Sequence, residues 1–161
     1  MNTAAVVPKY TAALEFLERA IELYLRGDSY YAALHLAGAS EEVLAVYVRG
    51  LPSGPSSTCG STSDQLKQLF IALDSPPSDK EREAAAKWFH DRTYNAKNSV
   101  KHKRGQRDHS LDFNPKEEAE ELIELAMSTY FQLFSRTNIP YLACIEDFDR
   151  QRRSQRPPGE A

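Results

Sequence analysis

The strongest constraint on the fold is the position of the prolines and glycines, which fall between stretches of helical periodicity rather than inside them. In residues 10–26, for example, apolar side chains recur at three- and four-residue steps, and Gly27 follows as a stop signal. No stretch alternates apolar and polar residues as a half-buried strand would, and no internal repeat is present. The sequence therefore predicts an all-α fold, an up-and-down bundle of five to six helices.

Start signals place the remaining helices. Each signal is a side chain that caps a helix N-terminus, in most cases with an acidic residue, an amide or a proline just inside the helix. The signals are Asp28 or Ser29 for a helix up to Arg49, Thr62 with Gln65, Ser78 with Glu81 for a helix to Lys101 or beyond, Asn114 with Pro115 for a helix to about Thr137, and Pro140 for a last short helix. We expect the second and fourth helices to lie side by side in the centre of the bundle.

The chain of 161 residues has the size of one domain. We predict a single helical-bundle domain over residues 1–149. Residues 50–62 are mostly Gly, Pro, Ser and Thr, which predicts the most mobile internal loop. Residues 150–161 are predicted to form a disordered basic tail.

The composition is typical of a soluble protein in a reducing compartment. Hydrophobic residues make up 41% of the chain and charged residues 27%, and no run approaches the ~20 apolar residues needed to cross a bilayer. The N-terminal stretch lacks the basic and long apolar regions of a secretory signal. The two cysteines, Cys59 and Cys144, do not suggest a disulfide framework. We therefore expect a cytoplasmic protein with no membrane partner.

Motifs for metals and cofactors are missing from the sequence. The four histidines and two cysteines lack the spacing of a zinc site. The glycine-rich loops that bind nucleotides and the GxSxG turn of hydrolases do not occur either. We predict no metal and no cofactor.

A carboxylate interrupts the apolar stripe of the predicted second helix. Glu41 falls on that stripe, and Glu42 lies on the adjoining one. Because a buried unpaired carboxylate is costly, Glu41 either reaches solvent or has a basic or hydrogen-bond-donating partner, which we expect on the fourth helix. The two glutamates are thus either structural or orient a cation or histidine across the bundle. Gly38, inside the same helix at a cost of ~1 kcal/mol relative to alanine, indicates close approach of another helix or chain.

One face of the predicted fourth helix carries polar groups suited to phosphate binding. Asn95, Asn98 and His102 follow at three- and four-residue steps, in register with Trp88 and Asp91. Residues 92–107 also contain six basic residues and no acidic one, in a chain with 20 basic and 23 acidic residues. A local basic segment is a footprint for phosphate, although a solvated helix end carries the same cations to complement its dipole. The basic residues are Arg92, Lys97, Lys101, Lys103, Arg104 and Arg107.

Two stretches, ALHLAGASEEVLAVYV and NAKNSVKH, resemble the HEPN superfamily of small all-helical domains from prokaryotic toxins, phage-defence proteins and nucleotidyltransferase partners. In that family an arginine, a polar residue, three further residues and a histidine often form a metal-independent ribonuclease site, and two copies face each other across a homodimer. Here Asn98 and His102 match the polar and histidine positions, and Lys97 stands at the arginine position. Glu41 and Glu42 resemble acidic positions of some members.

The resemblance implies a catalytic site for RNA made of His102, Asn98 and Lys97. His102 would exchange a proton with an RNA 2′-hydroxyl, Lys97 would stabilise the charge of the transition state, and Asn98 would orient the imidazole or the phosphate. Lysine keeps the charge of arginine but lacks its planar fork. Residues that would bind phosphate around the site are Arg92, Asn95, Lys101, Lys103 and Arg104. A homodimer that acts on RNA or a nucleotide in bacterial defence is the implied function.

Two other classes remain open, a bundle that binds a protein partner without catalysis and a purely structural bundle. Geometry separates them. Catalysis requires His102 exposed in a cleft near Lys97 or Arg92. Binding requires only the positive surface, and a structural role predicts that His102 is satisfied inside one subunit.

Overall fold

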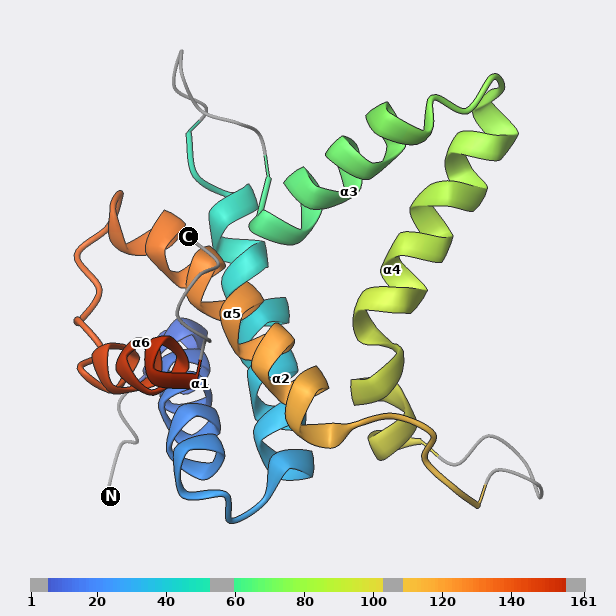
Figure 1. The fold of residues 1–161 in the computed structure, drawn as a ribbon. Coiled ribbons are helices and arrows are strands. Elements are labelled where there is room, and N and C mark those ends of the chain that lie inside the picture. The colour runs from blue at the N-terminus through green and yellow to red at the C-terminus, as the bar shows by residue number, and fades with distance from the viewer. Residues whose placement is uncertain (1–5, 53–59, 103–108, 156–161) are drawn as a thin grey trace.

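The computed structural model describes residues 6–52, 60–102 and 109–155. This part of the chain contains six α-helices and no β-strand (Figure 1), so the predicted all-α bundle of five to six helices is confirmed. The helices are α1 (Lys9–Arg26), α2 (Tyr30–Arg49), α3 (Thr62–Asp74), α4 (Asp79–Lys101), α5 (Pro115–Phe134) and α6 (Cys144–Gln155). None of them is long and apolar enough to span a membrane. Most of the predicted loop 50–62 lies outside the described residues.

Three helix N-termini follow the predicted signals, and that of α3 does not. Ser29, Ser78 and Asn114 each accept a hydrogen bond from a backbone N–H in the first turn of the helix that follows. For α3 the predicted capping box of Thr62 with Gln65 is wrong. Ser61 and Asp64 form it instead, because Asp64 is also held by the guanidinium of Arg49, with 2.7 Å between Nε and Oδ2.

The last helix begins and ends later than the sequence indicated. The Tyr130 hydroxyl donates to the carbonyl of Pro140 at 2.9 Å and accepts from the backbone N–H of Leu142 at 3.2 Å. These bonds tie residues 140–142 to α5, and α6 starts only at Cys144. α6 then continues to Gln155, past residue 150, where we had placed the start of the tail. Residues 156–161 lie outside the described part.

α2 is the central helix, and α1 and α5 cover most of it. The expectation that the second and fourth helices form the centre is therefore wrong. α2 has apolar side chains on nearly all sides, so two helices are needed to bury it, and α4 contacts it over only part of its length. The fully buried core includes Leu17, Ile21, Leu34, Leu44, Ile123, Tyr130, Ile145 and Phe148.

α3 and α4 form a hairpin that projects from this three-helix core (Figure 1). Ser63 is the only buried residue among those of α3, and α4 buries only Tyr94, Ala96 and Lys97. Among the described residues, five residue pairs joined by hydrogen bonds or ion pairs connect the hairpin to α2 and α5: Tyr94 with Glu41, Lys97 with Glu42, Asp64 with Arg49, Thr62 with Gln132, and Arg92 with Glu118. α1, α2 and α5 pack through a large apolar cluster, which Tyr94 and Ala96 of α4 join, so the polar contacts of the hairpin supplement a small apolar one.

Candidate functional site

The two stretches that carry the family resemblance meet where α4 crosses α2. Lys97 is buried, its ammonium pairs with the carboxylate of Glu42, and the same ammonium lies 5.0 Å from the centre of the Tyr94 ring. The stem of Lys97 lies directly on Gly38, since a Cβ at Gly38 would come within 2.1 Å of Lys97 Cδ and 3.0 Å of Leu122 Cδ2. The predicted close approach at Gly38 is confirmed, and the group that approaches is the lysine stem.

Glu41 lies beside this crossing and is 1% exposed. Its Oε2 accepts a hydrogen bond from the Tyr94 hydroxyl at 2.6 Å, which confirms the expected donor on the fourth helix. That hydroxyl also lies 3.1 Å from the Oγ of Ser63, whereas Glu41 Oε1 has no hydrogen-bond partner. Burial raises the pKa of Glu41 above its ordinary value, although the Tyr94 hydrogen bond and the charge of Arg49 act in the opposite direction. Burial likewise raises the pKa of Tyr94, and the neighbouring Glu41 adds to the shift.

A small pocket of about 150 Å³ adjoins Glu41, and its lining includes Arg49, Asp64, His90 and Tyr94. Burial alone would raise the pKa of Asp64, but hydrogen bonds from Arg49 and Ser61 outweigh burial and hold it below its usual range. The charged groups at this pocket are therefore engaged with one another. They fasten the start of α3 to the end of α2, which supports the structural interpretation of Glu41.

The members of the predicted catalytic set have different surroundings in the structure. The ammonium of Lys97 is held at Glu42 on α2, while His102 is exposed at the end of α4, with only its backbone N–H engaged, by the carbonyl of Asn98. Lys97 was expected to stabilise the charge of the transition state; in the structure its stem packs across Gly38 and its charge compensates the carboxylate of Glu42.

Four polar side chains remain at the end of α4, and we call them the α4 terminal face: Asn95, Asn98, Lys101 and His102. Asn98 is half-buried and the other three are exposed. Within the described part of the chain, none of the four side chains has a hydrogen bond or an ion pair.

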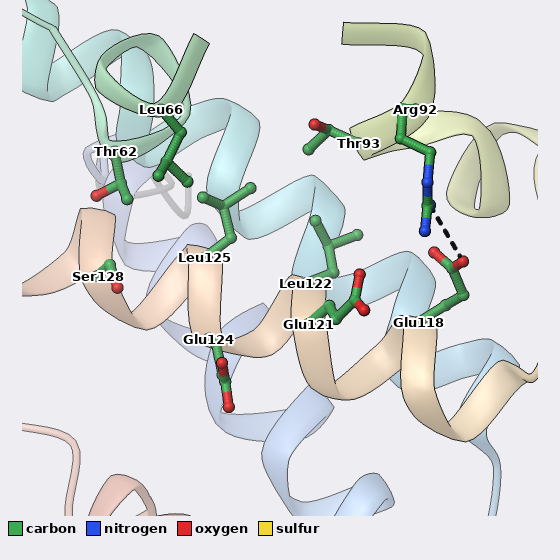
Figure 2. A pocket seen from close by; sticks show the side chains of 10 residues that line it. All are labelled: Thr62, Leu66, Arg92, Thr93, Glu118, Glu121, Leu122, Glu124, Leu125 and Ser128. Atoms are coloured by element: carbon green, nitrogen blue, oxygen red, sulfur yellow. Dashed lines mark hydrogen bonds and ion pairs between the residues drawn. The ribbon is translucent and has the colours of Figure 1, made fainter. Parts of the chain in front are cut away.

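Arg92 does not belong to this face. Its guanidinium points toward α5 and pairs with Glu118 at 3.4 Å (Figure 2). There it lines a groove of about 420 Å³ between α3, α4 and α5, together with Leu66, Leu122 and Glu121. Lys103 and Arg104, the other two residues expected to bind phosphate, lie outside the described residues.

Tyr94 and Asp64 were missed as members of the polar cluster. Tyr94 precedes Lys97 by three residues and therefore lies on the same side of α4. With Gly38 already indicating a close neighbour, this spacing was a signal that Tyr94 and Lys97 both face α2. Asp64 carried no comparable signal, since its partner Arg49 lies across a loop.

The described residues hold no group of three or more His, Cys, Asp or Glu side chains that could bind a metal ion. Comparisons with known protein families, with curated proteins and with solved structures found no match to this chain. Residues and geometry are therefore the basis for assigning a function.

Proposed function

We propose that this protein binds single-stranded RNA or nucleotides through the α4 terminal face, and that it binds them without cutting. The observation that carries the proposal is the set of four polar side chains at one helix end that have no side-chain partner among the described residues. Lys101 and His102 supply donors for phosphate, and Asn95 and Asn98 supply both donors and acceptors for sugar or base edges. The contact between Glu42 and Lys97, which joins the two HEPN-like stretches, adds support.

Binding is favoured over cleavage by the position of Lys97. A ribonuclease of this kind needs a cation beside the histidine to stabilise the charge that develops on the phosphate. Lys97 has a side chain that is only 5% exposed and neutralises Glu42. The α4 terminal face therefore retains groups that hold phosphate, whereas Lys97, the residue at the family's arginine position, is engaged by Glu42.

Lys101→Glu is expected to weaken RNA binding by roughly tenfold, because it replaces a phosphate-contacting cation with an anion. Fluorescence anisotropy of a labelled uridine oligonucleotide across a salt series measures the effect. In the wild type, log Kd should rise with log salt by ~0.7 per phosphate contact, and Lys101→Ala should lower that slope by about one contact.

Lys80→Glu is the matched control, since Lys80 is an exposed lysine near the opposite end of the same helix. Equal losses for the two lysines would contradict a local site, as would a wild type that does not bind at low salt. The same samples test cleavage. Cutting by the wild type that disappears in His102→Ala would overturn the binding-only proposal in favour of the catalytic one.

Protein–protein interaction is a second candidate, and a separate observation favours it. The α3–α4 hairpin exposes four large apolar side chains, which are Leu66, Leu69, Leu73 and Trp88. Such a patch on a soluble protein marks an interaction surface.

A further inference from the structure

One side of the α3–α4 hairpin is an uncovered apolar surface. Leu66, Leu69 and Leu73 follow at three- and four-residue steps along one side of α3, and Leu73 is 77% exposed. Phe70 stacks on Trp88 with 5.1 Å between ring centres, which joins this row to α4, yet Trp88 remains 56% exposed. α3 has only 13 residues, a length at which an isolated helix is marginal in water, so further packing on this exposed side would stabilise it.

The α4 side of this surface is complementary to itself. Four residues of α4 that follow at steps of four, three and four form one row on the helix. In chain order the row has an acidic, a small, a large and a basic side chain: Glu81, Ala85, Trp88 and Arg92. An antiparallel second copy centred between residues 86 and 87 sets Glu81 opposite Arg92 and Ala85 opposite Trp88, and each pairing occurs twice. A two-fold interface requires this kind of reciprocal match.

The charged ends of the row are exposed. Glu81 is exposed and forms no ion pair within the described part of the chain, and its one hydrogen bond comes from the hydroxyl of Ser78. The Arg92 side chain is 57% exposed, and its contact with Glu118 is long, at 3.4 Å. Leu66 and Arg92 line the same groove (Figure 2), so the leucine row of α3 and the α4 row lie on the same side of the hairpin.

We infer that this hairpin face, made of the leucine row and the α4 row, binds the same face of a second copy of the chain to form a two-fold dimer. The inference goes beyond RNA binding and does not depend on it. With 1.5 Å of rise per residue, His102 lies roughly 23 Å along α4 from the two-fold axis. The two α4 terminal faces are then roughly 45 Å apart, so this dimer differs from the arrangement that the family resemblance implies, in which two sites face each other.

Sedimentation velocity and tryptophan fluorescence test the dimer, because Trp88 is the only tryptophan in the chain. The wild type should sediment as a species of twice the 18.2 kDa mass of one chain. Its tryptophan emission should shift to shorter wavelength as the protein concentration rises, because Trp88 becomes buried in the dimer. Leu69→Glu combined with Leu73→Glu should sediment as a monomer with unchanged helix content. Val46→Glu, at an exposed valine on α2, is the control and should remain dimeric.

A charge exchange tests the register of the pairing. Glu81→Arg and Arg92→Glu should each weaken association by about tenfold, because each puts like charges opposite one another at two places. The double variant should recover wild-type association. A wild type that stays monomeric, or a leucine double variant that stays dimeric, would overturn the proposal. A charge-exchanged double variant that does not recover wild-type association would overturn the antiparallel register.

Discussion

Gly38→Ala is expected to destabilise the protein by about 1–3 kcal/mol, the usual cost of forcing extra atoms into a packed site. The added methyl group would lie 2.1 Å from Lys97 Cδ and 3.0 Å from Leu122 Cδ2, so both side chains must move. On an open helix surface the same substitution would stabilise by ~1 kcal/mol, because alanine favours helix. Urea unfolding followed by circular dichroism measures the difference.

Two variants of Lys97, each combined with Gly38→Ala, test whether the lysine stem causes the destabilisation. Lys97→Ala removes the stem, so Gly38→Ala added to it should become neutral or stabilising. Lys97→Met keeps most of the stem without the charge, so Gly38→Ala should remain destabilising there. Equal effects of Gly38→Ala in all three backgrounds would show that the close approach of Lys97 is not what requires glycine at this position.

Glu41→Ala is expected to cost about 2–3 kcal/mol, because it leaves a cavity and removes the acceptor of a buried hydroxyl. The Tyr94 hydroxyl would keep only its contact with Ser63. Glu41→Gln retains the shape and an oxygen that can accept from Tyr94, so its cost should be much smaller. Similar losses for the two variants would mean that the ionised carboxylate itself stabilises the fold.

The contribution of Glu41 to the stability of the fold should change with pH in a defined direction. Because the pKa of Glu41 is raised in the folded state, mainly by burial, the folded protein holds this proton more tightly than the unfolded chain does. The stability that this carboxyl group contributes is therefore fully present below its unfolded pKa and is lost as pH rises through its folded pKa. The unfolding free energy of Glu41→Gln relative to the wild type should increase over that range. A constant difference across pH would contradict the raised pKa.

The sequence patterns predicted the helices well because periodicity and capping are local. They also indicated that Glu41 needed a donor, since a carboxylate on an apolar stripe has few alternatives. They did not identify the neighbours of α2, because an apolar stripe shows which side of a helix is covered but not which helix covers it. The burial of Lys97 was not predicted for a related reason. Lysine is mostly exposed, but its long apolar stem can cross a packed site while the ammonium reaches a carboxylate near the surface.

The polar attachment of the α3–α4 hairpin divides the molecule into two units of different resistance to opening. The outer part of the hairpin, α3 and the first half of α4, is held to α2 and α5 mainly by the exposed ion pairs Arg49–Asp64 and Arg92–Glu118, which contribute little each and are weakened by salt. The α1–α2–α5 core is secured by apolar burial. The hairpin can therefore open as a separate cooperative unit while the core stays folded. In the single chain, amide protons of α3 and of the first half of α4 should exchange with solvent much faster than those of α2 and α5, and added salt should increase their rate selectively.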